Sequence, residues 1–328
     1  MKLMRTLALL ALPLALGAQA QAASEAPADY PSRPIRLIVG FSAGGATDIS
    51  ARLFAKYMGD ALGQSVVVEN RAGAAGTLSA DIVSHSAPDG YTLLYTTSSI
   101  HGISPNIYPK LNWDPIKDFA PIALVAKYPQ TLLVNNDLPA KTLGDLVALV
   151  KRNPGKYSYA SAGTGGTQHL AAALLASAAG LDMVHIPYKG MSAAYPDLMA
   201  GRVQLMFENA PSALPFVQRG SVRALAVSSA QRLPALPEVP TVAESGYPGF
   251  EVVAWSGFVA PAGTPQPVID KLNAAILKAS QAPELKAWLV ESGSPTDLVG
   301  PPAKFGEFLK HELAFWKKAV DISGAKAE

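Results

Sequence analysis

The chain has 328 residues, 49% hydrophobic and 16% charged, and its 27 basic residues nearly balance 25 acidic ones. Nucleic acid is not expected as a partner, because the basic and acidic residues balance, no basic tract occurs and the chain has only five histidines. The absence of cysteine excludes disulfides. A chain this long can bury a core without such cross-links and commonly forms two domains.

The first 23 residues are predicted to be a secretory signal peptide. Lys2 and Arg5 precede an apolar run over residues 7–16, small residues follow, and cleavage is expected between Ala20 and Ala23. The run is shorter than the ~20 residues of a membrane-spanning helix. Without Lys2 and Arg5 the formal charge falls from +2 to zero. We therefore expect a nearly neutral, soluble protein of the periplasm, with no cysteine for a lipid anchor.

The mature chain starts with alternating strands and helices. Residues 35–39, 65–69 and 91–96 are short β-like runs, and apolar residues at every fourth position over 49–61 predict an amphipathic helix. A second helix is expected over 77–86. This βαβ order predicts an α/β fold with a parallel sheet.

Four prolines over 101–121 interrupt this order, and a second alternating set follows. Its predicted strands cover residues 122–126, 131–134, 157–160, 183–187, 203–207 and 223–227. Its predicted helices cover residues 143–151, 168–179, 193–200 and 212–218. After an extended run over 251–259, three helices that begin at prolines are expected over 265–280, 283–291 and 302–322. We expect two doubly wound lobes, 24–124 with 254–328 and 125–253, joined by two crossings near Leu124 and Ala254.

Two glycine-rich turns are the strongest functional signal. Gly40-Phe-Ser-Ala-Gly-Gly-Ala-Thr-Asp48 and Ser161-Ala-Gly-Thr-Gly-Gly-Thr-Gln-His169 each join a predicted strand to a predicted helix. Such a turn directs free backbone N–H groups and the positive end of the helix dipole at one point, which suits an anion. No lysine follows either turn as in a P-loop, and the second lacks the last glycine of a dinucleotide fingerprint. Backbone donors without a fixed cation favour a carboxylate.

Side chains at these turns and at strand ends have alternative interpretations. Asp48 either caps its helix, paired with Arg52, or accepts a hydrogen bond from a ligand. His169 either donates to a ligand or packs. Ser98 and Glu208 follow predicted strands, where a doubly wound sheet forms its crevice, or they are simply solvated.

An enzyme is the main alternative class. Gly40-Phe-Ser42-Ala-Gly44 matches the Gly-x-Ser-x-Gly nucleophile elbow of serine hydrolases. That elbow normally lies at the centre of a sheet, whereas this one follows the first strand, and the histidines show no further triad signature. No metal-ligand spacing occurs, so neither a metal nor a cofactor is expected.

The chain resembles the Bug-type receptors, the extracytoplasmic solute-binding components of tripartite tricarboxylate transporters. The motifs that carry the resemblance span the mature chain: Tyr30-Pro-Ser-Arg-Pro-Ile35, Gly44-Gly-Ala-Thr-Asp48, Val66-Val-Val-Glu-Asn-Arg-Ala-Gly73, Ala87-Pro-Asp-Gly-Tyr-Thr92, Ser161-Ala-Gly-Thr-Gly-Gly-Thr-Gln-His-Leu170, Pro187-Tyr-Lys-Gly190, Ala224-Leu-Ala-Val227, Val239-Pro-Thr-Val-Ala-Glu244 and Ala260-Pro-Ala-Gly-Thr-Pro265. The resemblance implies a type II periplasmic binding protein fold, in which two lobes close on a small carboxylate and the two turns act as a pincer.

The resemblance also implies a non-enzymatic monomer that delivers its ligand to membrane permease subunits; a ligand-dependent sensor would use the same cleft. The expected ligand-binding residues are Phe41, Ser42, Ala43, Gly44, Gly45, Thr47, Asp48, Ser98, Ser161, Ala162, Gly163, Thr164, Gly165, Gly166, Thr167, His169 and Glu208. The family usually has Asp where this chain has Glu208, which is one methylene longer.

Overall fold

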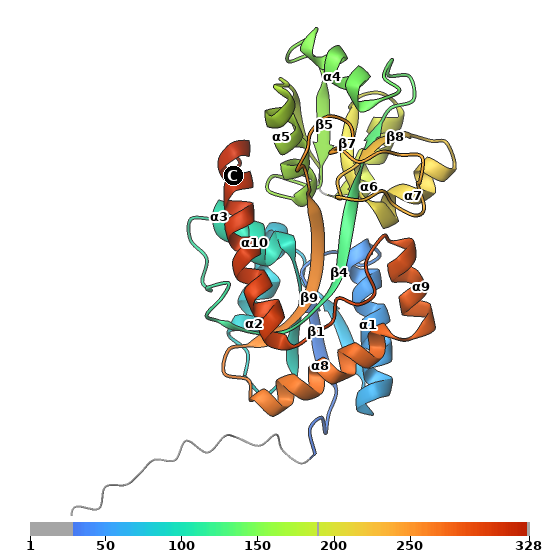
Figure 1. Ribbon diagram of the computed structural model, residues 1–328. Coiled ribbons are helices and arrows are strands. Elements are labelled where there is room, and N and C mark those ends of the chain that lie inside the picture. Colours follow the sequence, from blue (N-terminus) through green and yellow to red (C-terminus); the bar gives the residue numbers. More distant parts are fainter. Residues whose placement is uncertain (1–28, 189, 327–328) are drawn as a thin grey trace, which may run out of the picture.

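The computed structural model describes residues 29–188 and 190–326, so the predicted signal peptide and its cleavage site lie outside the described residues. Figure 1 shows two α/β lobes connected by two long strands, β4 and β9. The strands are β1 (Ile35–Val39), β2 (Val66–Asn70), β3 (Thr92–Thr97), β4 (Phe119–Val134), β5 (Ser158–Ser161), β6 (Val184–Pro187), β7 (Leu205–Asn209), β8 (Arg223–Val227) and β9 (Val253–Pro261). The two-lobed α/β fold predicted from the sequence is confirmed.

Helices cover the sheets of both lobes. They are α1 (Ala46–Leu62), η1 (Ala74–Gly76), α2 (Thr77–Ser84), η2 (Ser98–Ile103), α3 (Ser104–Ile107), α4 (Leu143–Lys151), α5 (Thr167–Ala179), α6 (Met191–Met199), α7 (Ala210–Gln218), α8 (Gln266–Ser280), α9 (Pro283–Glu291) and α10 (Pro302–Ser323). Most follow the apolar periodicity of the sequence. The exception is the segment η2 and α3, which lies in the proline-rich stretch where no element was expected.

The strand order β2-β1-β3-β9-β4-β7-β5-β6 runs through both lobes. In the first lobe β1 pairs in parallel with β2 and β3, and β9 is antiparallel to both β3 and β4. The C-terminal part of β4, from Gln130, pairs instead with β7 and β8 of the second lobe. One strand therefore belongs to two sheets.

The sequence predicted two extended segments here, 122–126 and 131–134, and both lie in β4, which is continuous between them. The gap between the predicted segments contains Pro129, and a proline without an N–H group normally interrupts a sheet. Pro129 is the last position of β4 paired with β9, directly before Gln130, where the pairing with β7 begins.

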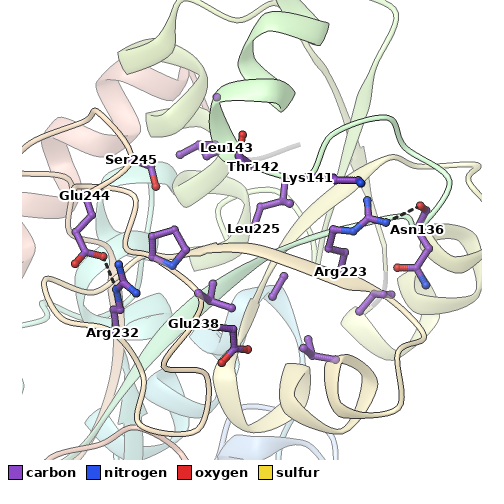
Figure 2. A pocket seen from close by; sticks show the side chains of 16 residues that line it. Asn136, Lys141, Thr142, Leu143, Arg223, Leu225, Arg232, Glu238, Glu244 and Ser245 are labelled. Atoms are coloured by element: carbon purple, nitrogen blue, oxygen red, sulfur yellow. Dashed lines mark hydrogen bonds and ion pairs between the residues drawn. The ribbon is translucent and has the colours of Figure 1, made fainter.

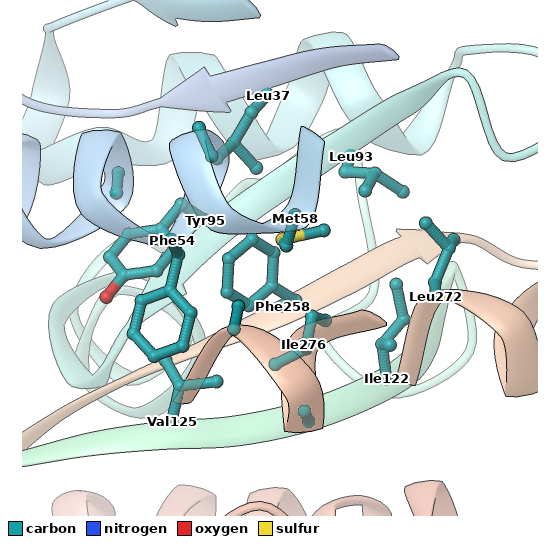
Figure 3. Close-up of a cluster of buried hydrophobic side chains, with 14 of the residues drawn as sticks. Leu37, Phe54, Met58, Leu93, Tyr95, Ile122, Val125, Phe258, Leu272 and Ile276 are labelled. Atoms are coloured by element: carbon teal, nitrogen blue, oxygen red, sulfur yellow. The ribbon is translucent and has the colours of Figure 1, made fainter. Parts of the chain in front are cut away.

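Each lobe has its own apolar core. Figure 3 shows the core between the first sheet and helices α1 and α8, with Phe54 and Met58 from α1 facing Leu272 and Ile276 from α8. The Phe258 ring of β9 lies between those of Tyr95 and Phe54, with centroid distances of 5.0 and 5.6 Å. Because β9 supplies Phe258, the C-terminal half of the chain completes the core of the first lobe.

Helix α10 contacts the cores of both lobes, which the sequence did not predict (Figure 1). Phe305 and Leu309 pack with residues of the first sheet, whereas Trp316 and Val320 pack with α5 and the second sheet. Between them, the Glu312 carboxylate accepts hydrogen bonds from the indole N–H groups of Trp255 (2.6 Å) and Trp316 (2.8 Å). The helix thus forms a third connection beside the two long strands.

Candidate functional site

The first glycine-rich turn joins β1 to α1. At Gly40 a Cβ atom would lie 2.6 Å from Ser79 Oγ and 2.9 Å from Gly76 Cα, so only glycine fits against the start of α2. Gly44 has φ +83°, in the region that favours glycine. Gly45 is the extended N-cap of α1 and no side chain caps that helix start. The first N–H groups of α1 therefore have no side-chain cap among the described residues.

Asp48 holds this turn in shape. It is 2% exposed, and its Oδ2 accepts the Gly44 N–H and the Arg52 Nε–H, both at 2.9 Å. Its Oδ1 accepts the Asn70 amide at 2.8 Å, and the same amide donates to the Phe41 carbonyl at 2.9 Å. Burial raises the pKa of Asp48, but the hydrogen bonds that it accepts outweigh burial and keep the pKa below its usual value. Both carboxylate oxygens are thus engaged within the protein, and Asn70 is a positioning residue that the sequence did not reveal.

The second turn, between β5 and α5, repeats this construction. Gly163 and Gly165 have φ +120° and +78°, and Gly166 is an extended N-cap without a side-chain cap. The Gly165 N–H donates to His169 Nδ1 at 3.1 Å. This bond has the same four-residue spacing as the bond from Gly44 to Asp48, so the two turns use equivalent positions, with an imidazole in place of a carboxylate.

The acceptor role of His169 requires a neutral ring. Burial, and secondarily the neighbouring His185, lower the pKa of His169 to about 4. Its ring stacks on His185 with centroids 3.9 Å apart, and the Tyr159 ring lies nearly parallel to both, 5.0 Å from His185 and 6.1 Å from His169. His185 Nε2 in turn lies 2.7 Å from Ser161 Oγ. The stacked rings therefore hold the second turn through the contacts of His169 with Gly165 and of His185 with Ser161.

The segment η2 and α3 lies between the two turns. The Ile100 side chain fills the space beside Gly40 and Gly76, next to the first turn. On the other side, a Cβ atom at Gly165 would lie 2.3 Å from Ile107 Cδ1. Ser98 begins the segment and is 1% exposed. The first turn thus contacts Ile100 of η2 and the second contacts Ile107 of α3, and η2 is a π-helical turn of the kind common at functional sites.

The other predicted residues of the turns follow one pattern, exposed in the first turn and more enclosed in the second. Ser42, Ala43, Gly44, Gly45 and Ala162 are exposed, Phe41, Thr47, Gly163, Thr164 and Gly166 are partly buried, and Ser161, Gly165 and Thr167 are buried.

Glu208 lies at the end of β7, beside the second turn. It is 3% exposed; Oε1 accepts the Asn209 N–H at 2.7 Å, and Oε2 has no hydrogen-bond partner among the described residues. Thr131 of β4 is paired with Glu208 in the sheet, and its Oγ1 likewise has no partner there. Burial raises the pKa of Glu208 to about 8, although the Asn209 N–H and the Gln168 amide lower it. Neither Thr131 nor Gln168 had been singled out, because nothing in the local pattern distinguishes a polar residue in a strand or a helix start.

The histidines do not form a triad with Ser42. A ring nitrogen of each histidine lies beside another residue: Asp81 for His85, Thr96 for His101, Gly165 for His169, Ser161 for His185 and Glu312 for His311. Ser42 lies exposed on the first turn. The geometry therefore favours a binding turn over a nucleophile elbow.

A separate hollow of about 760 Å³ lies on the second lobe, between α4, β8 and the loop before Ser245 (Figure 2). Two of its arginines are engaged with the protein. Arg223 donates to the carbonyls of Leu138 and Ala140 at 3.3 and 3.0 Å, and Arg232 pairs with Glu244 at 2.9 Å. None of the predicted site residues lines this hollow.

Within residues 29–188 and 190–326, no three His, Asp or Glu side chains are grouped as metal ligands would be. Over the same residues, no helix has both the length and the hydropathy needed to cross a bilayer.

Two α/β lobes connected by long strands, with strand-to-helix turns from each lobe around one element, define the class of two-lobed periplasmic solute-binding proteins. Rpa4515 of R. palustris, solved with adipate, superposes with a TM-score of 0.85 at 34% identity, covering 90% of this chain and 99% of its own. Periplasmic binding protein BugD has a TM-score of 0.83 at 36% identity, covering 91% and 100%. MatC (Rpa3494) from Rhodopseudomonas palustris, with bound malate, has a TM-score of 0.81 at 35% identity, covering 89% and 100%.

Sequence comparison defines the family. The family model described as "Tripartite tricarboxylate transporter family receptor" matches residues 50–321. A UPF0065 protein from the tcbD-tcbE intergenic region of Pseudomonas sp. (strain P51) is 41% identical over 292 residues, 89% of this chain and 86% of the relative. Protein BugT of Bordetella pertussis is 37% identical over 298 residues, 90% and 91%. The chain belongs to the tripartite tricarboxylate transporter receptor family, whose members are solute-binding receptors.

Proposed function

We propose that this protein is a periplasmic receptor that captures a small organic carboxylate between its lobes and delivers it to the permease subunits of a tripartite tricarboxylate transporter. One observation carries the proposal: each glycine-rich turn leads into a helix start without a side-chain cap, at Gly45 and Gly166, and both turns contact the segment η2 and α3 through Gly40 and Gly165. Their N–H groups and helix dipoles offer an anion several donors without any catalytic group. The adipate and malate in the solved relatives support a carboxylate.

Closure of the lobes supplies much of the binding energy. The turns bind through backbone donors, and hydrogen bonds to a carboxylate strengthen when water is excluded around them. We place the lobes at 24–124 with 254–328 and at 125–253, with the crossings near Leu124 in β4 and Ala254 in β9. The mature protein, cleaved between Ala20 and Ala23, acts as a monomer without a cofactor.

A thermal-shift and calorimetric panel of monocarboxylates, dicarboxylates, amino acids and aromatic acids tests the proposal on the purified mature protein. A true ligand at 100 times its dissociation constant stabilises the fold by about 2.7 kcal/mol. A carboxylate that produces this shift and binds with one-to-one stoichiometry supports the function. Silence toward every carboxylate refutes it.

Two glycines that flank α1 provide a matched pair of variants. Gly44 and Gly63 have φ +83° and +69°, and an added Cβ meets no atom within 4 Å at either position. Gly44→Ala and Gly63→Ala therefore carry a similar backbone penalty, about 1–2 kcal/mol. Only Gly44 lies in the turn, so we expect Gly44→Ala to weaken carboxylate binding at least tenfold and Gly63→Ala to leave it unchanged. Equal effects of the two variants would contradict a role for the first turn.

A further inference from the structure

A buried carboxyl oxygen without a partner lies at the edge of the candidate site. Glu208 Oε2 is enclosed, while Oε1 is already engaged by the Asn209 N–H. A buried polar atom left unpaired is strongly unfavourable, so native folds leave such atoms mainly where another molecule supplies the partner. Thr131 Oγ1, on the paired position of β4, is unpartnered in the same way. Two adjacent strands thus present unused polar groups at one place.

The groups around Glu208 are neutral. β4 contributes Thr131 and α6 contributes Tyr195. The start of α5 contributes the Gln168 amide, which is near enough to lower the pKa of Glu208 but does not form a hydrogen bond with Oε2. The Tyr195 hydroxyl donates to the Ser212 carbonyl at 3.0 Å and so has a partner of its own. Among the described residues, no lysine or arginine contributes to the pKa of Glu208.

A carboxyl group in such surroundings keeps its proton. Burial disfavours the charged form and raises the pKa of Glu208 to about 8, so the neutral acid predominates at pH 7. A neutral carboxylic acid has one O–H donor, which an ionised carboxylate lacks. The charge and the shape of the site therefore suit an acceptor oxygen on the ligand.

Building on the proposed function, we propose that Glu208 is a specificity-determining residue that selects dicarboxylates: as a neutral acid it donates from Oε2 to the ligand's second carboxylate, while the first is held between the two turns. The Thr131 hydroxyl is the second donor to the same carboxylate. A ligand with a methyl group at that position leaves both groups unpaired, and a ligand with an ammonium group meets a donor instead of an acceptor.

Two sets of probes of fixed length isolate the distal group. Adipate, hexanoate and 6-aminohexanoate share six carbons, and succinate, butyrate and 4-aminobutyrate share four. Calorimetry at pH 6.5 should show the dicarboxylate of one set binding at least tenfold more tightly than its two partners. Because the donor is lost as Glu208 ionises, the dissociation constant of the dicarboxylate should rise about tenfold between pH 6.5 and pH 9.

The variant Glu208→Gln tests the residue itself. It retains an N–H donor of similar shape but cannot ionise, so the dicarboxylate should bind roughly threefold to tenfold more weakly at pH 6.5 and with no change up to pH 9. Glu312→Gln is the matched control, since burial also raises the pKa of Glu312, which lies in α10 between two indoles. That control should keep the wild-type pH profile.

The outcomes separate this inference from the proposed function. Tighter binding of the amino acid than of the dicarboxylate would show that Glu208 is ionised and pairs with an ammonium group, which overturns the inference. Equal binding of monocarboxylates and dicarboxylates also overturns it. So does a Glu208→Gln variant whose binding depends on pH in the same way as that of the wild-type protein. In both cases the receptor function stands. Failure of the wild-type protein to bind any carboxylate would instead refute the proposed function.

Discussion

The protonation state of Glu208 leads to a prediction for the ligand-free protein: replacing Glu208 by Gln changes how the free energy of unfolding depends on pH. In the folded state burial raises the pKa of Glu208 to about 8, from a usual value of 4.5. Between these two values the unfolded chain has released the proton and the folded chain has not. Rising pH therefore favours unfolding of the wild-type protein over this range, and the effect ends near pH 8, where the folded group also ionises.

The expected size follows from the shift. Each pH unit between the two pKa values lowers the stability by about 1.4 kcal/mol, so at pH 7 the wild-type protein has lost about 3 kcal/mol relative to pH 4.5 through this group. Glutamine cannot ionise, and Glu208→Gln escapes this loss. The difference in stability between variant and wild type should thus grow by about 3 kcal/mol, in favour of the variant, from pH 4.5 to pH 7.

Urea unfolding followed by tryptophan fluorescence measures this difference. Both proteins are unfolded at pH 4.5, 5.5, 6.5 and 7.5 without ligand, and the difference cancels every other titrating group that they share. Glu291→Gln, at an exposed position of α9, controls for the change of one formal charge. A difference between wild type and Glu208→Gln that stays constant within 1 kcal/mol over this range would refute the reasoning, because Glu208 would then be ionised in the folded protein.

Three further predictions concern the turns. Asn70→Ala removes the amide that joins Asp48 to the Phe41 carbonyl. The variant should lose about 1–3 kcal/mol of stability and should bind its ligand at least tenfold more weakly in calorimetry. Unchanged binding would contradict the positioning role of Asn70. Gly165→Ala places a Cβ atom 2.3 Å from Ile107 Cδ1. The variant should bind its ligand more weakly, and its radius of gyration in X-ray scattering should be larger than that of the wild type. If neither quantity changes, the result counts against a close contact of the second turn with α3. Because burial lowers the pKa of His169 to about 4, the wild-type protein should lose stability as the pH falls from 6.5 to 4, and His169→Gln, measured by urea unfolding, should show a shallower loss.

The elements that the sequence predicts well are those whose residues form local patterns. The order of strand and helix up to β3 follows from short apolar runs and from apolar residues at every fourth position. Glu208 could be identified as a candidate because it directly follows the apolar end of a predicted strand. In each case the pattern lies within about fifteen residues of chain, so no knowledge of distant contacts is needed.

Other parts of the site depend on contacts between segments far apart in the sequence. The segment η2 and α3 was not predicted, because it runs into the proline-rich stretch and is too short for its apolar spacing to indicate a helix; its isoleucines lie against Gly40, Gly76 and Gly165. Asn70 is an ordinary polar residue at a strand end until β2 is placed beside the first turn. The continuity of β4 could not be seen either, because Pro129 lies at the point where β4 changes partner from β9 to β7, which only the assembled sheets show.

The electrostatics of the two turns explain how a receptor could both hold and release its ligand. The charge of Asp48 is balanced by Arg52, His169 is neutral, and Glu208 keeps its proton, so the described site offers a carboxylate dipoles and hydrogen-bond donors rather than a free cation. A fixed arginine in the cleft would attract the ligand in the open and the closed form alike. Neutral donors instead compete poorly with water until the lobes close and exclude it. In the proposed function, affinity is then tied to closure of the lobes, and their opening is enough to release the ligand.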